Sequence, residues 1–260
     1  MVDLVRRLRR MEFWRSLRHY DFVSPSLVSL PVGFEKLFPT MEKGRSFNPL
    51  VPHTGRWDRR FPGVGWCTLE EATILYNYGL QFRDKEALEV GCWVGWSTIA
   101  VGLAGVHLTA VDPLLGGSPQ AATLKTTLKR AGLADAVELA AGKSPAAIDA
   151  LRETGCRWAL VFIDGDHEGE APVQDAQACA AGALEDAVIV LHDAVQENVC
   201  AALTWLMEHG WSCGIHYTAQ LLAVAWRGAA RPVLHRPDPA IEWESLVQRR
   251  WPHCAGFPRV

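Results

Sequence analysis

The chain has 260 residues, of which 49% are hydrophobic and 21% are charged, and its mean hydropathy is +0.02. This balance excludes a disordered or collagen-like chain and is typical of one sizeable globular domain or two small ones. No stretch reaches the roughly 20 apolar residues that cross a bilayer, and the N-terminus is charged where a signal peptide has its apolar core. We therefore expect a cytoplasmic protein.

The net charge of -3 is unevenly distributed along the chain. Residues 1–60 contain 12 Lys and Arg against six Asp and Glu, a surplus of six positive charges, so residues 61–260 carry a net charge of -9. A duplex-binding protein needs its basic surface on the folded domain itself. The distribution therefore predicts no nucleic-acid partner. The seven cysteines are odd in number and form no CxxC pair, which favours reduced, mostly buried thiols over a disulfide framework or a zinc finger.

The N-terminal part of the chain, residues 1–66, is predicted to be an extension of a basic helix and a lid. Residues 2–19 place apolar side chains at helical spacing opposite six arginines. Such a helix packs on its own domain or on a second subunit, or alternatively contacts an anionic membrane surface. Residues 21–66, rich in Pro, Gly and aromatic side chains, are expected to form a long ordered loop. Within it, His53 and Arg56 either contact an anionic group of a substrate or are solvated.

Residues 67–228 show the alternation of apolar runs and helices that predicts an α/β domain with a doubly wound, mostly parallel, seven-stranded sheet. Thr68 and Glu71 predict the start of a helix that ends at Gly79, and Ser118 and Ser144 each precede a proline that opens a helix. The expected strands are residues 87–90, 106–111, 137–141, 158–163 and 187–191, with residues 211–217 and 221–226 as an antiparallel hairpin at one edge.

The last segment, residues 229–260, is predicted to be a tail that packs on the domain or on a partner subunit. Its Trp243 and Trp251 are expected to be packing anchors. The flanking helices and tryptophans that we expect to be exposed favour a homo-oligomer.

A glycine-containing segment, Glu89-Val-Gly91-Cys-Trp-Val-Gly95-Trp-Ser97, follows the first predicted strand and precedes a helix. Glycines at this point let the backbone turn sharply and approach a ligand closely. The next strand ends at Asp112, 21 residues after Gly91, where a carboxylate can accept both hydroxyls of an adenosine ribose. The two features predict an adenosine-containing ligand, and they leave open a nicotinamide dinucleotide.

With Phe162-Ile-Asp164-Gly-Asp166-His167 and Leu191-His192-Asp193, residues 68–226 resemble the class I S-adenosylmethionine-dependent methyltransferases. The resemblance is to the small-molecule O-methyltransferases of the catechol, macrolide-sugar and cephalosporin-tailoring groups. It implies that the acid before the first glycine and the glycine loop hold the methionine end of the cofactor. It also implies that the second-strand acid holds the ribose and that the loop after the third strand flanks the adenine. The cofactor-binding residues implied in this way are Glu89, Gly91, Trp93, Gly95, Ser97, Asp112, Gly142, Lys143, Ser144 and Asp164.

The segment around Asp164 indicates the type of reaction. It lacks the Asn/Asp-Pro-Pro-aromatic sequence usual in base-directed N-methyltransferases of this fold, so transfer to a hydroxyl is favoured. Asp164 and Asp193 would place two oxygen ligands side by side for Mg or Mn, and a bound metal would lower the pKa of a chelated substrate hydroxyl. His167, which matches the position of the catechol branch's catalytic lysine, is the candidate base, or alternatively braces its loop.

The sequence departs from the family pattern beside the second aspartate. The catechol branch supplies a third metal ligand from an Asn directly after that aspartate, but here the residue is Ala194. His192 is then either a ligand, which would favour Mn or Zn over Mg, or a structural or substrate-contacting residue. The need for a metal therefore stays open at this point. The remaining histidines, at positions 19, 53, 107, 209, 216, 235 and 253, are expected at the surface or at its boundary.

The sequence therefore predicts an S-adenosylmethionine-dependent O-methyltransferase that acts on a hydroxyl of a small molecule or glycan, with Asp164, His167 and Asp193 at the reaction centre. One rival is an NAD(P)-dependent oxidoreductase, whose fingerprint would have a glycine at the position of Trp93. The other rival is a non-catalytic binding or scaffold protein of the same fold.

Overall fold

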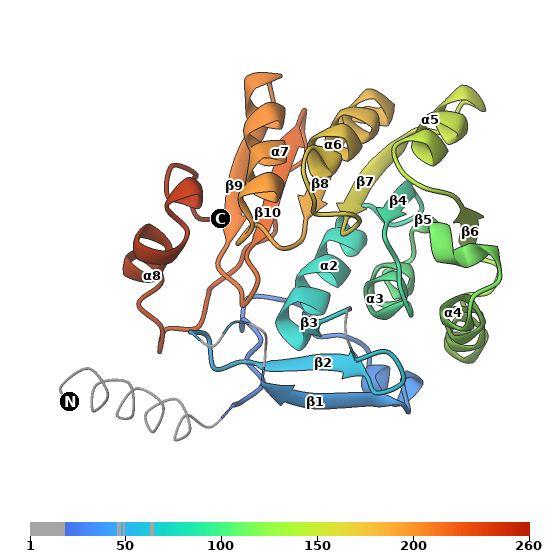
Figure 1. The fold of residues 1–260 in the computed structure, drawn as a ribbon, viewed down its shortest axis with the longest axis horizontal. Helices are drawn as coiled ribbons and strands as arrows, with labels where there is room; N and C mark the ends of the chain where they lie inside the picture. The colour runs from blue at the N-terminus through green and yellow to red at the C-terminus, as the bar shows by residue number, and fades with distance from the viewer. Residues whose placement is uncertain (1–18, 46–47, 49, 63–64) are drawn as a thin grey trace.

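The fold, seen in a computed structural model that describes residues 19–45, 48, 50–62 and 65–260, centres on a seven-stranded sheet (Figure 1). The strand order is β6-β5-β4-β7-β8-β10-β9, in which β10 runs antiparallel to both of its neighbours and the other pairs are parallel. The predicted doubly wound sheet with an antiparallel hairpin at one edge is confirmed. The strands are β4 Glu86–Val90, β5 His107–Asp112, β6 Val137–Ala141, β7 Trp158–Ile163, β8 Ala183–Leu191, β9 Ser212–His216 and β10 Leu222–Arg227.

Two hydrophobic cores lie on opposite faces of this sheet. In β7, Val161 and Ile163 pack into one core, while Leu160 and Phe162 pack into the other, as expected when successive side chains of a strand point to opposite faces. One core contains residues of α5 Ala146–Glu153, α6 Ala171–Gly182 and α7 Glu197–Glu208, and the other contains residues of α2 Leu69–Gln81, α3 Trp96–Leu103 and α4 Pro119–Ala131. Helices therefore cover both faces of the sheet (Figure 1).

Local capping explains where two of these helices begin. The Thr68 hydroxyl accepts the N–H of Glu71, and the Glu71 carboxylate accepts the N–H of Thr68, which completes the predicted capping box of α2. Ser118 caps α4 in the predicted way, and Gly132 ends it in the left-handed conformation. The prediction for Ser144 was wrong, because α5 has Pro145 at its N-cap position without a side-chain hydrogen bond, and the Ser144 hydroxyl donates to Asp175.

The predicted loop over residues 21–66 is wrong in its middle and final parts. A 3-10 turn, η1 Phe34–Leu37, is followed by a three-stranded antiparallel sheet of β1 Met41–Arg45, β2 Thr54–Asp58 and β3 Cys67–Thr68. β2 was not predicted because its sequence does not alternate polar and apolar residues. The strand buries an arginine instead. Arg56, which is 1% exposed, is held by the carboxylates of Asp21 and Glu35, each at 2.8 Å. The predicted basic helix over residues 2–19 lies, except for its last residue, outside the described residues.

The C-terminal tail packs against the same core as α7. It contains α8 Trp243–Arg250 and the 3-10 turn η3 Pro252–Cys254. Trp243 and Trp251 are buried in this core, so they are packing anchors within the chain, and the expectation that they are exposed is wrong. Among the described residues, no helix is both long enough and apolar enough to span a membrane.

Three histidines predicted at the surface, His53, His216 and His235, are buried instead. His53 lies 3.0 Å from Asp238, His235 lies 2.8 Å from Glu70, and His216 lies 2.7 Å from the hydroxyl of Tyr78. Burial lowers the pKa of all three, to about 4 for His235, because the charged imidazolium would lose its hydration. These neutral rings join the N-terminal segment, α2 and the tail through hydrogen bonds.

We expect the Trp243→Ala variant to lose about 3–5 kcal/mol of unfolding free energy, because it removes a fully packed aromatic side chain from the core. Urea unfolding of the two chains measures this loss. The control is Leu234→Ala, in the same tail but with a 66% exposed side chain, which should change the free energy by less than about 0.5 kcal/mol. Equal effects of the two substitutions would show that the tail is not part of the folded core.

Candidate active site

A cavity of about 750 Å³ opens at the carboxyl ends of β4, β5, β7 and β8. Of the residues predicted to bind a cofactor or a metal, it is bordered by Gly91, Trp93, Ser97, Asp112, Gly142, Lys143, Ser144, Asp164, His167, His192 and Asp193. Glu89 and Gly95, which belong to the same prediction, are not among the described residues that border it. The carboxyl ends of these four strands, with the loop that follows β6, therefore bring nearly the whole predicted set to one cavity.

The glycine loop owes its path to two left-handed backbone positions. Gly91 has a φ of 84°, and a Cβ atom there would lie 2.1 Å from the backbone oxygen of Asp164. Gly95 has a φ of 93° and is the N-cap of α3, where a Cβ atom would lie 2.3 Å from a methyl group of Leu124. Residues with a side chain fit neither position. The glycines therefore let β4 approach β7 closely and let α3 begin at the cavity.

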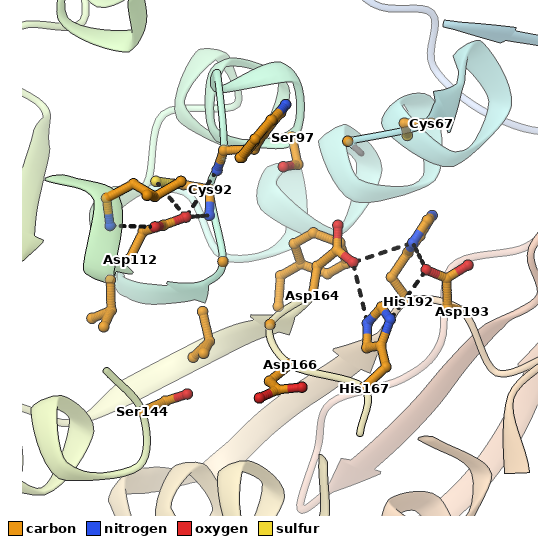
Figure 2. Close-up of a pocket in the computed structure, with 18 of the residues that line it drawn as sticks. Cys67, Cys92, Ser97, Asp112, Ser144, Asp164, Asp166, His167, His192 and Asp193 are labelled. Carbon is orange, nitrogen blue, oxygen red and sulfur yellow. Dashed lines mark hydrogen bonds and ion pairs between the residues drawn. The ribbon is translucent and has the colours of Figure 1, made fainter. Parts of the chain in front are cut away.

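Asp112 holds the glycine loop in place. Its Oδ2 atom accepts the backbone N–H groups of Cys92 and Trp93, each at 3.1 Å, and its Oδ1 atom accepts that of Leu114 at 2.8 Å (Figure 2). Leu114 belongs to the 3-10 turn η2 Pro113–Gly116. A carboxylate has about four lone-pair sites, so a ligand in the cavity can still donate to it. The predicted ribose acid therefore also organises the loop that faces it.

Glu89 lies beneath the loop and does not face the cavity directly. Its side chain is fully buried, and Oε1 accepts the hydroxyl proton of Ser97 at 2.5 Å. Ser97 itself borders the cavity. Burial raises the pKa of Glu89 to about 8, which means that the buried carboxyl is protonated over much of the neutral range.

The loop after β6 borders the cavity opposite the glycine loop. Its Lys143 ammonium is exposed and lies 3.9 Å from Asp166, while the Ser144 hydroxyl donates to Asp175 at 2.9 Å. Burial raises the pKa of Asp175 to about 6. The hydrogen bond between Ser144 and Asp175 therefore connects this loop to α6. The exposed Lys143 side chain can reach solvent or a ligand in the cavity.

Two carboxylates and two imidazoles meet at the tips of β7 and β8 (Figure 2). The Nδ1 atom of His192 is 3.3 Å from a carboxylate oxygen of Asp164 and 3.3 Å from one of Asp193. The Nε2 atom of His167 is 3.6 Å from a carboxylate oxygen of Asp164, and its Nδ1 atom is 3.6 Å from one of Asp193. Gln220 donates to Asp193 at 2.7 Å, which fixes the orientation of that carboxylate. The site therefore alternates acidic and basic groups within contact distance.

Glu71, on the far side of His192, is a site residue that the sequence analysis missed. Its Oε2 atom lies 3.7 Å from Nε2 of His192, and both side chains are buried. The sequence assigned Glu71 to the helix cap, which it also forms, so its second contact gave no separate signal. Burial opposes the charge of both groups, but their pairing outweighs it: the pKa of Glu71 falls to about 2, and Asp164 and Asp193 raise that of His192 well above its ordinary value.

The charged groups of this cluster stabilise one another strongly enough to outweigh the cost of burial. Burial favours a neutral Asp164, yet the neighbouring His192 and His167 lower its pKa to about 2. Burial also opposes the charge on His167, and Asp164 and Asp193 raise its pKa nevertheless. The pair of carboxylates therefore stabilises positive charge placed between them, whether on imidazole or on another cation.

The donor atoms of this cluster fit a divalent cation. Ligand atoms of Asp164, His167 and Asp193 all lie within 4.8 Å of one another. Carboxylate oxygens with one or two imidazole nitrogens suit Mn or Zn better than Mg. The Asp166 carboxylate, by contrast, accepts the backbone N–H of Glu168 at 3.0 Å and is not in this group.

Aromatic side chains, several of them from the segment interpreted as a lid, form a wall beside the glycine loop. The indole of Trp93 contacts the ring of Phe61 edge-on at 5.8 Å, and a Cβ atom at Gly65 would lie 2.2 Å from it. Trp66, which borders the cavity, stacks on Trp57 at 4.3 Å. The predicted acceptor-contacting residues His53 and Arg56 are not among the described residues bordering the cavity. The high density of aromatic residues between positions 57 and 66 was the available signal.

We expect Gly91→Ala to destabilise the protein by about 2 kcal/mol more than Gly132→Ala does. Both positions have positive φ and carry a strain of about 1–2 kcal/mol with a side chain, but no atom lies within 4 Å of a Cβ at Gly132. The difference in urea-unfolding free energy thus isolates the contact between the tips of β4 and β7. If both variants lose the same free energy, that contact is not tight.

We expect the stabilisation of the wild-type chain relative to Glu89→Gln to fall as the pH rises from about 5 to 8. Between the ordinary and the raised pKa of Glu89, the folded chain holds a proton that the unfolded chain has released, so unfolding becomes easier at higher pH. The slope has an upper limit of about 1.4 kcal/mol per pH unit. Urea unfolding of both chains across this range measures it, and a constant difference would contradict the raised pKa.

Comparisons with known proteins agree with this geometry. Residues 88–194, less than half of the chain, match the model of a family described as a methyltransferase domain. A search of curated proteins found no relative that matches the chain in sequence.

Solved structures match over a longer part of the chain. The O-methyltransferase TomG from Streptomyces achromogenes, in complex with S-adenosylmethionine, is 16% identical with a TM-score of 0.59, over 78% of this chain and 92% of that one. An O-methyltransferase from Bacillus cereus with S-adenosylhomocysteine is 13% identical with a TM-score of 0.56, over 65% and 85% of the two chains. A precorrin-6y C5,15-methyltransferase from Geobacter metallireducens is 17% identical with a TM-score of 0.51, over 62% and 88%. The chain therefore has the fold of these class I methyltransferases, and its residues 88–194 match the methyltransferase domain model.

Proposed function

We propose that the chain is an S-adenosylmethionine-dependent O-methyltransferase that acts on a hydroxyl of a small molecule or glycan. The observation that carries the proposal is the position of the Asp164, His167, His192 and Asp193 cluster in the same cavity as the glycine loop and Asp112. A methyl donor bound on the loop would have its sulfonium end beside carboxylates, and an acceptor hydroxyl beside an imidazole. The similar fold of a precorrin C-methyltransferase shows that the fold alone does not choose the accepting atom.

The cofactor would be held by groups that already face the cavity. Asp112 would accept the ribose hydroxyls, the N-terminus of α3 and Ser97 would contact the methionine end, and residues 142–144 would flank the adenine. S-adenosylmethionine supplies an activated methyl group, so the protein has mainly to position the acceptor in line with it. Glu89, as the buried partner of Ser97, would act on this end through the serine hydroxyl.

His167 would take the proton from the acceptor hydroxyl. Its side chain is 20% exposed at the cavity, and its two nitrogens lie beside Asp164 and Asp193. These carboxylates stabilise the imidazolium that forms when the proton arrives, which is the same effect that raises the pKa of His167. His167 accepts a proton only when it is itself neutral, so transfer should become faster as the pH rises through this raised pKa.

A divalent metal, Mg or Mn, would be held by Asp164 and Asp193, with His192 as a further candidate ligand, while His167 keeps its role as the base. Such an ion would lower the pKa of a chelated acceptor hydroxyl. His192 competes with this role, because its Nδ1 atom already lies between the two carboxylates and its partner Glu71 favours the charged imidazolium. We therefore propose that the metal assists the reaction by joining this cluster, with Glu71 and His192 holding the carboxylates in position.

The acceptor would enter beside the aromatic wall. The indoles of Trp66 and Trp93 border the cavity and offer flat apolar faces, which suit an aromatic or sugar ring that carries the hydroxyl. An NAD(P)-dependent oxidoreductase is disfavoured by the side chain of Trp93, which occupies the place where open glycine backbone would meet a pyrophosphate. The predicted homo-oligomer and the membrane contact of the N-terminal helix stay predictions.

Calorimetric titration with S-adenosylhomocysteine and, separately, NAD distinguishes the three candidate functions. We expect binding of S-adenosylhomocysteine and none of NAD, and loss of binding in Asp112→Ala. Binding of NAD alone would contradict the proposal, and binding of neither compound would favour a scaffold.

Methyl transfer to a panel of catechols and glycosides then tests the cluster. We expect His167→Gln and Asp193→Asn to keep cofactor affinity and to lose about 100-fold in turnover. Glu168→Gln, an exposed residue of the same turn that does not border the cavity, is the control that keeps turnover. Loss of turnover in a chelator, restored by Mn, would support the metal, and equal turnover with and without the chelator would refute it.

A further inference from the structure

Two cysteines and a histidine from distant parts of the sequence meet behind the carboxyl edge of the sheet. Cys200 lies in the first turn of α7, and His253 and Cys254 lie in the 3-10 turn η3 of the tail. One ligand atom from each of the three residues lies within 4.8 Å of the others. The cysteines are at most 2% exposed, and none of the three residues borders the methyltransferase cavity. This cluster is separate from the one that contains Asp164 and Asp193.

The two sulfur atoms are about as far apart as two sulfur ligands of a single zinc ion. The Sγ atoms of Cys200 and Cys254 are 3.6 Å apart. A disulfide bond would bring them to about 2.05 Å. Two thiolates on a tetrahedral zinc ion, with zinc–sulfur distances of about 2.3 Å, lie about 3.8 Å apart. The cysteines are therefore already placed as a pair of zinc ligands.

The histidine is oriented for the same purpose. Its Nε2 atom lies 3.2 Å from the backbone oxygen of Ala194, which can only accept a hydrogen bond, so Nε2 carries the proton and Nδ1 keeps its lone pair. Metal-binding histidines commonly donate their other ring N–H to a backbone carbonyl in this way. The Nδ1 atom of His253 lies 4.0 Å from the carboxylate of Glu197, which is three residues before Cys200 on the same face of α7. The Glu197 side chain is 85% exposed and lies outside the three-residue cluster, so its carboxylate would have to turn from solvent towards the ion to become the fourth ligand.

We propose that Cys200, His253 and Cys254 bind a structural zinc ion, with the Glu197 carboxylate as the fourth ligand. Thiolate and imidazole ligands select zinc over magnesium. As each zinc–sulfur bond forms, the thiol releases its proton to solvent. The two thiols then give up their hydrogen bonds to the backbone oxygens of Ala194 and His253, while the His253 ring keeps its own bond to Ala194.

The zinc ion would join three segments at a point next to the active site. Ala194 directly follows Asp193, α7 begins three residues later, and the tail comes from the C-terminal end of the chain. The turn η3 and the helix α7 are in direct contact. The ion would therefore hold the turn that carries Asp193 without taking part in methyl transfer.

Metal analysis of the purified full-length chain tests the site. After dialysis against zinc-free buffer, we expect about one zinc ion per chain by mass spectrometry of the elements, and at least about fivefold less in Cys200→Ala and in Cys254→Ala. Cys179→Ala is the matched control, because this cysteine is equally buried but lies in α6 outside the cluster. Asp193→Asn should also keep its zinc, which separates this ion from one in the cavity. Wild-type chain without zinc, or Cys200→Ala with undiminished zinc, would overturn the proposal.

Three measurements on the unaltered chain cover the case in which the cysteine variants do not fold. Cobalt added to the chelator-treated protein should give the near-ultraviolet charge-transfer band of a cobalt–thiolate bond. Chelator should also lower the melting temperature, and zinc should restore it. A cobalt spectrum without the thiolate band, or a melting temperature that does not respond to chelator, would overturn the proposal. The proposal would also be overturned if the mass of the chain is two hydrogens below that of the fully reduced chain and thiol titration finds five free thiols instead of seven. The two cysteines would then form a disulfide.

Discussion

The charge on Asp164, at the half-buried tip of β7, is the constraint on which the carboxyl edge of the sheet depends. A carboxylate removed from water must be paired with positive charge, and His167 and His192 provide it. His192 is buried in turn and requires Glu71 on its other side, while Asp193 shares both imidazoles with Asp164. Each charge in the row is stabilised by its neighbours, so the loss of one residue should change the protonation of the others. A site of this kind is suited to accept a proton or to hold a cation.

The topology of the sheet explains why this row lies beside a cofactor cavity. β4 pairs with β5 on one side and with β7 on the other, so the chain changes direction across the sheet at β4 and β7, where ligands bind in open α/β sheets. Gly91 lets the two strand tips approach each other, and Asp112 on β5 fastens the glycine loop from the other side. The adenosine side of the cavity, at β5 and β6, and the reaction side, at β7 and β8, therefore lie on either side of β4 in one sheet, which keeps their separation fixed.

Much of the sheet and most of the candidate site could be predicted from the sequence, because both depend on local patterns. Apolar runs identified the strands, and Asp112, Asp164 and Asp193 at the strand ends border one cavity, whereas Glu89 lies beneath it. Contacts between distant segments could not be predicted in this way. Arg56 is buried in a strand that has no polar alternation, and Glu71 has its contact with His192 hidden behind its role as a helix cap. The pair Cys200 and Cys254 is separated by 54 residues, so no spacing rule for metal ligands applies to it.

The tail contacts the chain beside the cavity at Ala194, whose carbonyl oxygen accepts a hydrogen bond from His253 and which directly follows the cavity residue Asp193. The account as a whole depends on where a cofactor lies relative to this edge. A crystal structure of the chain with S-adenosylhomocysteine tests that directly. We predict that the ribose hydroxyls donate to Asp112 and that the sulfur faces the space beside Asp164 and His167. An adenosine bound away from Asp112, or a sulfur pointing away from the row of carboxylates and imidazoles, would contradict the central claim.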